Sequence, residues 1–327
     1  MNPQQPLYLD ASTIRQLLTP DACRQVVADA MKALSSGQTI QKPREVMPLG
    51  DGRIFGLMPG ALGPTGYFGA KLISVFDDPE QPGRQAHRGV VILFEGQGGH
   101  PVCIADAEEI TLVRTAAASA VATDILARPD AHSLGIFGCG HQAAAHIDAI
   151  ARIRPLDEVL VWGRNHERAQ AFAAASAART GLDVRAVADP RFAAGADIIC
   201  TVTTSAEPVL LGEWVRPGAH VNAVGSSRPG KVEVDQPLVL ASRYIADSRA
   251  SALLEAAEFL DAKEAGVIGD DHIRAEIGEI LLGTAPGRVS ASDITFYKSV
   301  GHPVQDLASA AFAYQCATDK SPASSRR

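Results

Sequence analysis

Residues 134 to 146, which read LGIFGCGHQAAAH, place a short apolar run directly before two closely spaced glycines. Gly138, Gly140 and Ala143 form the pattern G-x-G-x-x-A. In such a loop the first glycine permits a tight turn, the second lets a diphosphate approach the backbone, and the third small residue allows close packing of helix on strand. The helix expected from about His141 would direct its free N–H groups at the phosphates. The loop therefore predicts dinucleotide binding, and a structural turn in an α/β domain is the alternative.

Apolar runs alternate with helical stretches in the part of the chain that follows Pro129. The runs cover residues 134–137, 159–162, 184–187, 198–202, 220–224 and 244–246. Strands that are continuously apolar and separated by helices are typical of a parallel sheet with both faces covered. We therefore predict an α/β fold, with a Rossmann-type doubly wound parallel sheet over residues 121–303.

The first part of the chain has the pattern of β structure over residues 53 to 106. GRIFGLMPGALG and YFGAKLISVF predict neighbouring strands, and HRGVVILFEGQGGHPVCIADA predicts a hairpin that turns at GQGG. Helices are expected over residues 20–34, after Thr111, and from near Pro303. We expect the last of these to pack back on the β-rich part, which gives a second, α+β domain of residues 1–120 together with 304–327.

The bulk composition argues against several classes of protein. The chain has 327 residues, a net charge of −7 and a pI of about 5.7, so we expect no nucleic-acid surface. No apolar run approaches the ~18 residues of a membrane span, so no membrane segment is expected. The nine histidines form no metal-binding motif, so no metal is expected. The five cysteines are odd in number and not closely paired, which favours a reducing, cytoplasmic setting.

The residues after the second apolar run, in VLVWGRN, bear on which dinucleotide binds. An NAD site usually carries an acid here, which accepts a hydrogen bond from the ribose 2′-hydroxyl. This chain has Gly163, Arg164 and Asn165, with Arg168 one turn further on. Because a guanidinium holds a 2′-phosphate and a carboxylate repels it, we predict NADP(H) as the preferred cofactor, with NAD(H) as the second option. The alternative is that Arg164 only solvates a loop.

Three cations of the first domain stand out by their placement. Arg114 is expected in or near the first turn of the helix after Thr111, where a positive side chain is unfavourable unless an anionic ligand reverses the interaction. Lys71 lies inside a predicted strand, either as a gatekeeper of an edge strand or as a site residue. Arg44 directly precedes the β region. Ordinary surface charge is the alternative for each of the three.

Several motifs spread nearly end to end along the chain are more specific. They are PREVMP, LMPG, GAKLISVF, ADAEEITLVRTAAASAVAT, GCGHQA, WVRPGAHVNAVGSSRPGKVEVD and EIGEILLGTAPGRVSASDITFYKSVGHPVQDLASA. Together they resemble the ornithine cyclodeaminase/μ-crystallin family. The resemblance implies a homodimer in which each chain has a Rossmann domain and a separate domain for substrate binding and dimerisation.

Within this family the chain is similar to the reducing branch. True cyclodeaminases carry an aspartate in GGD-x-P, a glutamate before LMP and an aspartate after the second strand, where this chain has Ser227, Gly56 and Gly163. Its GxSRP-type sequence and Arg164 are instead similar to ketimine and Δ1-pyrroline-2-carboxylate reductases. The resemblance implies an NAD(P)-dependent oxidoreductase that transfers a hydride to C2 of a cyclic imine carboxylate. Δ1-Pyrroline-2-carboxylate would give proline, and Δ1-piperideine-2-carboxylate would give pipecolate.

The resemblance also implies roles for individual residues. Arg44, Lys71 and Arg114 would bind the substrate carboxylate, and Lys71 would help to supply a proton. Ser227 would hydrogen-bond the imine nitrogen or a water, with a structural turn as its alternative, and Val300 would face the nicotinamide and substrate. The family positions that would contact the cofactor are Thr115, Gly140, Gln142, Thr203, Val224, Lys231 and Ser299. The glycine loop and the residues after the second apolar run add Gly138, His141, Arg164, Asn165 and Arg168, and Gly225 follows Val224.

Two other functions stay open. The first is an ornithine or lysine cyclodeaminase, or an alanine-type amino-acid dehydrogenase. The second is a non-catalytic, NADPH-dependent protein that binds small ligands, like the crystallin members of the family. In each case the expected partner besides a second copy of the chain is a small molecule.

Overall fold

The computed structural model describes residues 5–63, 66–77, 85–227 and 230–319. The chain divides into two compact units, residues 1–114 with 302–327 and residues 115–301. Helix α3 (Ala107–Leu126) carries the chain from the first unit into the second. None of the helices within the described ranges is both long and apolar enough to cross a lipid bilayer.

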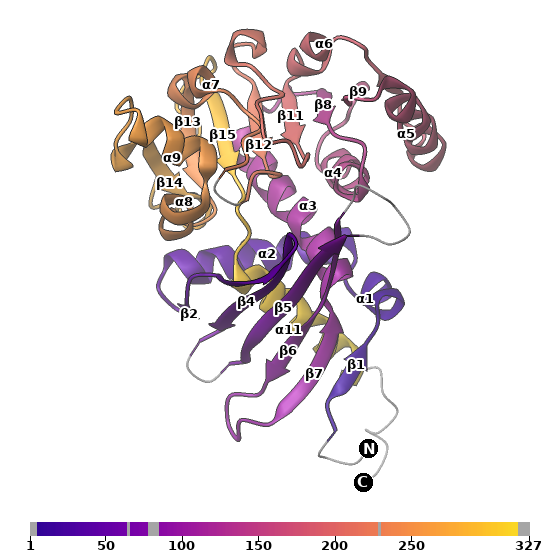
Figure 1. Ribbon diagram of the computed structural model, residues 1–327, viewed down its shortest axis with the longest axis vertical. Coiled ribbons are helices and arrows are strands. Elements are labelled where there is room, and N and C mark those ends of the chain that lie inside the picture. The colour runs from indigo at the N-terminus through magenta and orange to yellow at the C-terminus, as the bar shows by residue number, and fades with distance from the viewer. Residues whose placement is uncertain (1–4, 64–65, 78–84, 228–229, 320–327) are drawn as a thin grey trace. The chain divides into compact units, whose positions relative to one another are not determined.

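The first unit is built on a mostly antiparallel sheet (Figure 1). Its strands are β1 (Leu7–Leu9), β2 (Ile40–Gln41), β3 (Glu45–Gly50), β4 (Arg53–Ala61), β5 (Phe68–Asp77), β6 (Gln85–Phe94) and β7 (Pro101–Asp106). Their order is β1-β7-β6-β5-β4-β2, with β3 also paired to β4, and β1 runs parallel to β7. The predicted neighbouring strands are β4 and β5, and the predicted hairpin is β6 and β7, so both predictions are confirmed.

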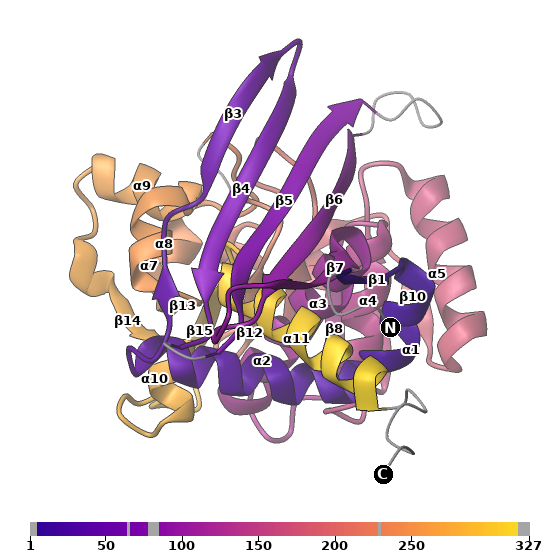
Figure 2. The ribbon, with the colours of Figure 1, turned by 90° about the horizontal axis from the view of Figure 1, so that it is seen from below.

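Three helices complete this unit: α1 (Ala11–Leu17), α2 (Pro20–Ser35) and α11 (Pro303–Asp319). Thr19 caps α2 and Pro20 occupies its first turn, where a missing N–H is not needed. Helix α11 packs against α2 and against β4, β5 and β6, as Figure 2 shows. The expectation that the last helix packs on the β-rich part of the chain is therefore confirmed.

The second unit contains an eight-stranded sheet in which all pairings are parallel (Figure 1). The order is β10-β9-β8-β11-β12-β15-β13-β14. The strands are β8 (Ser133–Phe137), β9 (Glu158–Trp162), β10 (Val184–Ala186), β11 (Ile198–Thr201), β12 (His220–Ala223), β13 (Ser242–Ala246), β14 (Ile273–Glu276) and β15 (Ile294–Lys298). The predicted α/β, doubly wound fold is confirmed, and each predicted apolar run is one of these strands.

The helices of this unit connect successive strands. They are α4 (His141–Ala151), α5 (His166–Thr180), α6 (Pro190–Ala194), α7 (Gln236–Ala241), α8 (Arg249–Glu255), α9 (Ala257–Glu264) and α10 (Ile277–Leu281), with short 3-10 turns η1 (Gly212–Trp214) and η2 (Asp270–His272). Every residue of β8, β11 and β12 is buried, as expected of a parallel sheet with both faces covered. The short strand β14 has the polar sequence IRAE and was not predicted.

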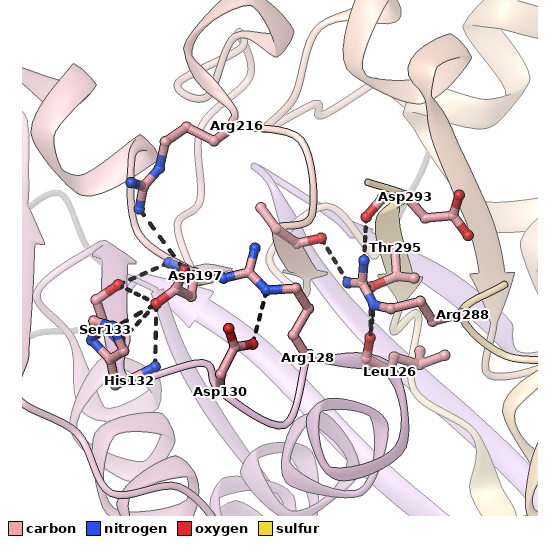
Figure 3. Close-up of polar contacts among 11 residues, drawn as sticks. Leu126, Arg128, Asp130, His132, Ser133, Asp197, Arg216, Arg288, Asp293 and Thr295 are labelled. Atoms are coloured by element: carbon pink, nitrogen blue, oxygen red, sulfur yellow. Dashed lines mark hydrogen bonds and ion pairs between the residues drawn. The ribbon is translucent and has the colours of Figure 1, made fainter. Parts of the chain in front are cut away.

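A polar cluster lies at the amino edge of this sheet (Figure 3). Arg128 donates to Asp197 at 2.9 Å, and the Ser133 hydroxyl donates to the same carboxylate at 2.9 Å. Arg288 donates to the carbonyl oxygen of Leu126 at 2.8 Å. These bonds attach the end of α3 and the starts of β8 and β11 to one another, at the edge opposite the strand ends that a cofactor would meet.

Two histidines of the second unit are fully buried with neutral partners. His146 has Nε2 2.9 Å from Ser119 Oγ, and His220 has Nδ1 3.0 Å from Thr295 Oγ1. Burial lowers the pKa of His146 to about 4 and that of His220 to about 3, from an ordinary 6.5. Both are therefore neutral in the folded protein at pH 5 and protonated in the unfolded chain.

We accordingly predict that acid destabilises the second unit between about pH 6.5 and pH 4. Near pH 5 the unfolded chain binds about two more protons at these histidines, so their contribution falls by roughly 2.5 kcal/mol per pH unit. Urea unfolding at pH 7 and pH 5 measures the fall, and His146→Gln should remove about half of this part of it. The exposed His100→Gln is the control and should leave the slope unchanged. An unchanged slope in His146→Gln would contradict the assignment.

Candidate functional site

The glycine loop after β8 has the geometry of a phosphate-binding turn. Gly138 has φ +126°, and an added Cβ would lie 2.9 Å from the carbonyl oxygen of Val202. Gly140 has φ −109° and precedes α4 directly, and nothing lies within 4 Å of where its Cβ would be. The first glycine is thus required by the turn itself. The second leaves open space in front of the N-terminus of α4, where N–H groups and the helix dipole favour an anion.

Most of the predicted cofactor residues follow the carboxyl ends of parallel strands. Thr203 follows β11, Val224 and Gly225 follow β12, and Ser299 follows β15. Ligands of open α/β sheets bind at this edge, at the point where the strand order reverses. Here the reversal falls between β8 and β11. Thr115 lies instead on α3, and Lys231 lies in the loop after β12.

A cavity of about 560 Å³ flanks this point. It is lined by Trp162, the last residue of β9, by Arg164 after it, by residues 205–209 after β11, and by Pro190 and Trp214. Tryptophan side chains beside a guanidinium suit an adenine ring and a phosphate. The described part of the structure therefore provides room for an adenosine moiety at the ends of β9 and β11, the two strands that pair with β8.

The residue at position 163 bears on whether the adenosine moiety of the cofactor carries a 2′-phosphate. A Cβ added at Gly163 would lie 2.6 Å from Cys139 Sγ. The acid usual in NAD sites therefore has no room at position 163 while Cys139 keeps its place. Arg164, the next residue, is exposed and lines the cavity.

The remaining predicted cofactor residues differ in the exposure of their side chains and in their hydrogen bonds. The Asn165 side chain caps α5 by accepting from the backbone N–H of Arg168 at 2.9 Å. Arg168 and His141 are exposed. Ser299 and Val300 are buried, and Ser299 Oγ has no hydrogen-bond partner among the described residues. An orphaned buried hydroxyl at the cofactor edge, an open glycine loop and the cavity together fit a dinucleotide.

The first unit brings two of the three predicted cations together around a carboxylate that sequence reasoning missed. Asp306 in α11 is fully buried. Lys71 Nζ lies 2.8 Å from its Oδ2, and Arg114 Nε lies 2.9 Å from its Oδ1. Arg114 Nη1 also donates to Gln305 Oε1 at 2.8 Å. The three charged side chains thus carry one net positive charge in a buried place, which favours an anionic ligand.

Two expectations about these cations are wrong. Helix α3 begins at Ala107, because Asp106 accepts from the backbone N–H of Glu109 at 2.8 Å. Arg114 is therefore its eighth residue, and the argument from the first turn does not apply. Lys71 is no edge-strand gatekeeper, because β5 lies between β4 and β6 and the side chain is buried.

Burial and neighbouring charge set the protonation of this cluster. Burial lowers the pKa of Lys71 from 10.5 to about 8, although Asp306 opposes the shift and Arg114 and Arg44 add to it. Burial would raise the pKa of Asp306, but Arg114 and Lys71 hold it below its ordinary value. Lys71 is thus an ammonium at neutral pH that releases a proton more readily than an exposed lysine. Arg44 is partly exposed and lies directly before β3.

His302 is a further member that sequence reasoning missed. It is buried, and burial lowers its pKa to about 4, with Asp306 opposing and Arg114 and Arg44 adding to the shift. In the sequence, Asp306 and His302 are indicated only by the motif GHPVQD, which lies at the start of an otherwise apolar helix.

These features define a class: a dinucleotide-binding unit joined to a unit with a buried cationic site. The ornithine cyclodeaminase/mu-crystallin family model matches residues 4–321. Ketimine reductase mu-crystallin of Mus musculus is 36% identical over 315 residues, 94% of this chain and 96% of the relative. The chain belongs to the ornithine cyclodeaminase/mu-crystallin family, as its motifs predict.

Two solved structures are similar over nearly their whole length. Thermococcus litoralis Δ1-pyrroline-2-carboxylate reductase, in complex with NADH and L-proline, has a TM-score of 0.91 and 30% identity, and the match covers 96% of this chain and 98% of that one. An archaeal alanine dehydrogenase dimer with bound NAD has a TM-score of 0.90 and 28% identity, and the match covers 96% and 97%.

Proposed function

We propose that this protein is an NAD(P)H-dependent reductase of a cyclic imine carboxylate. The observation that carries the proposal is the pairing, in one chain, of a dinucleotide loop with a buried cluster of Lys71 and Arg114 around a single carboxylate. The similarity to a ketimine reductase and to a Δ1-pyrroline-2-carboxylate reductase supports the same reaction. The reduced cofactor supplies a hydride to C2 of the ring imine when it is bound.

The cofactor would be held by the residues of the second unit. Gly138, Gly140 and the N-terminus of α4 would bind its diphosphate, with His141 and Gln142 in the first turn. Arg164 would hold a 2′-phosphate, and Thr203, Val224 and Ser299 would lie at the nicotinamide end. Thr115, Gly225 and Lys231 complete the proposed set, while Asn165 contributes by capping α5 and Arg168 by its charge.

The residues of the first unit would bind and protonate the substrate. Arg44 and Arg114 would hold the carboxylate, which fixes the orientation of the ring. Reduction of C=N adds one hydride to carbon and one proton to nitrogen. Lys71 is an ammonium with a lowered pKa and would provide that proton, directly or through water. Ser227 would hydrogen-bond the imine nitrogen or that water, and Val300 would border the ring.

Cyclodeaminase activity is disfavoured at two positions. That activity needs acids near a distal ammonium, and this chain has Ser227 and Gly56 where the cyclodeaminase motifs have them. A Cβ at Gly56 would lie 3.0 Å from Ile73 Cγ1, so a glutamate there would require Ile73 to move. Ornithine and lysine would therefore find no partner for their second amino group.

The function is tested by steady-state assays with five- and six-membered cyclic imine carboxylates, each with NADPH and with NADH. We expect cofactor oxidation with at least one imine. Ammonia release from ornithine without added reductant would support the cyclodeaminase, and reduction of pyruvate with ammonia would support the alanine-type dehydrogenase that a solved relative represents. Cofactor binding without turnover of any of these compounds would contradict an enzymatic role.

The preference for NADPH is part of the proposal, and Arg164→Asp tests it. We expect kcat/KM for NADPH to fall by about 10- to 100-fold, because a charged hydrogen bond is lost and a carboxylate then repels the 2′-phosphate. The value for NADH should change by less than about threefold. Arg185→Asp, on the exposed strand β10, is the matched control and should alter neither. Equal losses for both cofactors would contradict the assignment of Arg164.

We also propose a homodimer that forms through the outer face of the first sheet, which is the face turned away from α11. Met47 and Phe55 are cross-strand partners on this face, and both are exposed, as is Phe68. Exposed apolar patches of this kind mark interfaces. Phe55→Glu should therefore halve the mass measured by light scattering, whereas Phe192→Glu, at an exposed position of α6 in the second unit, should not. A wild-type chain that is monomeric at micromolar concentration would contradict the proposal.

The proposed compartment is reducing, as in the cytoplasm. All five cysteines are free thiols. Three of them, Cys23, Cys103 and Cys200, are buried, and burial raises the pKa of each thiol to about 12. These thiols behave as small apolar side chains and require no oxidising environment.

A further inference from the structure

Lys298, the last residue of β15, has a fully buried ammonium that the site as described does not use. Its Nζ lies 2.6 Å from the carbonyl oxygen of Ser226, 2.7 Å from Ser226 Oγ and 3.0 Å from Glu258 Oε2. Glu258 in α9 also accepts from the Tyr244 hydroxyl at 2.8 Å and from Ser226 Oγ at 3.2 Å. Lys298 therefore binds both Ser226, in the loop after β12, and the carboxylate of Glu258, which is its counter-ion.

Gly225, the residue before Ser226 in that loop, is held by the buried side chain of Glu233, whose pKa is raised by burial. Glu233 accepts from the backbone N–H of Gly225 at 2.6 Å and from that of Thr203 at 2.5 Å. A Cβ at Gly225 would lie 2.0 Å from the carbonyl oxygen of Thr203, so the loop is closely packed there. Two consecutive residues, Gly225 and Ser226, are thus fixed by the buried side chains of Glu233 and Lys298, and Ser227 comes next.

Packing stability does not account for the buried pair of Lys298 and Glu258. Both side chains are almost completely buried, and removing two charges from water costs more than a well-packed apolar pair of similar size. The position of the lysine supplies another reason. From Lys298 the chain continues into Ser299 and Val300, so the bonds to Ser226 tie the loop after β12 to the loop after β15.

We propose that Lys298, paired with Glu258, is a positioning residue for the nicotinamide end of the cofactor and for Ser227. This inference rests on the proposed function, since it concerns the same site. The phosphates would be bound at the glycine loop, away from this pair. Loosening the loop should therefore disturb hydride transfer and the surroundings of the ring more than cofactor affinity.

The test is the double variant Lys298→Met/Glu258→Gln, which removes both charges and leaves no buried ion unpaired. We expect kcat to fall by about 10- to 100-fold, because small displacements of reacting groups have effects of this size. The Kd for NADPH should change by less than about threefold. The fluorescence of bound NADPH should shift toward that of free NADPH, since a mobile ring meets more water. This second readout needs no turnover.

The matched control is Arg128→Gln/Asp197→Asn, which neutralises an ion pair of the same unit at the opposite, amino edge of the sheet (Figure 3). It should retain kcat and the NADPH fluorescence of the wild type. Should Lys298→Met/Glu258→Gln not fold, Ser226→Ala removes the hydroxyl alone and should lower kcat by about three- to tenfold with the same change in fluorescence.

Two results would overturn the proposal. One is a folded double variant with the kcat and NADPH fluorescence of the wild type. The other is an equal loss of kcat in the control, which would show that any neutralised ion pair has this effect. A wild type that binds NADPH but reduces no imine would contradict the proposed function instead, and the fluorescence comparison would still decide whether Lys298 positions the ring.

Discussion

Arg114→Met should lower kcat/KM for the imine by about 100- to 1,000-fold while leaving the Kd for NADPH within about threefold of the wild type. The guanidinium is buried, with Nε bonded to Asp306 and Nη1 to Gln305. Truncating one partner of a buried, hydrogen-bonded charge pair typically costs 2–5 kcal/mol or more, and about 1.4 kcal/mol corresponds to a tenfold change in rate. The loss should fall on substrate use because Arg114 lies outside the dinucleotide-binding unit.

A second substitution separates the contribution of the charge of Arg114 from that of its planar shape. Arg114→Lys keeps the positive charge but lacks the planar fork that binds a carboxylate with two parallel bonds. We expect it to recover part of the loss, about tenfold. Arg53→Met is the control, because Arg53 belongs to the same unit and forms an exposed pair with Asp51. The assignment of Arg114 fails if Arg114→Met, shown to be folded by circular dichroism, retains kcat/KM within about threefold.

The cationic site was only partly predictable, because its anion comes from a distant part of the chain. Arg114 and Asp306 are 192 positions apart in the sequence. No local sequence pattern predicts that α11 packs against β5. A lysine within a strand, such as Lys71, is unusual, but its burial follows from the position of β5 in the sheet, which the sequence of a single strand does not reveal. Asp306 itself is visible in the sequence only as a charge at the start of an apolar helix.

Local features were predicted more fully than long-range ones. The glycine loop, the strand before it and the helix after it are contiguous, so one stretch of 13 residues is sufficient to predict all three. Helix α3 begins at Ala107 and not after Thr111, because Asp106 caps it by accepting from the backbone N–H of Glu109. The strand β14 was missed because its polar residues do not form the apolar run expected of a buried strand. Pairing with β13 at the edge of the sheet is what makes it a strand.

Gly140→Asp should raise the Kd for NADPH by about 100-fold or more without destabilising the fold. At φ −109° the residue has an ordinary backbone conformation, and its Cβ position is free of neighbours within 4 Å. Aspartate is moreover a favoured N-cap residue, so α4 should be as stable as before or more so by a few tenths of a kcal/mol. The carboxylate would occupy the space in front of the helix and repel the diphosphate that the loop is proposed to bind.

Two further substitutions in the same loop make this result specific. Gly140→Asn has the same size without the charge and should raise the Kd by less, about tenfold, which separates repulsion from bulk. Gly138→Ala should instead lower the midpoint of urea unfolding, because φ +126° and the 2.9 Å approach to the Val202 carbonyl oxygen strain any side chain there. Titration of NADPH fluorescence measures the affinities. If Gly140→Asp binds NADPH as the wild type does, the diphosphate does not lie at this loop, and the dinucleotide site must be sought elsewhere on the sheet.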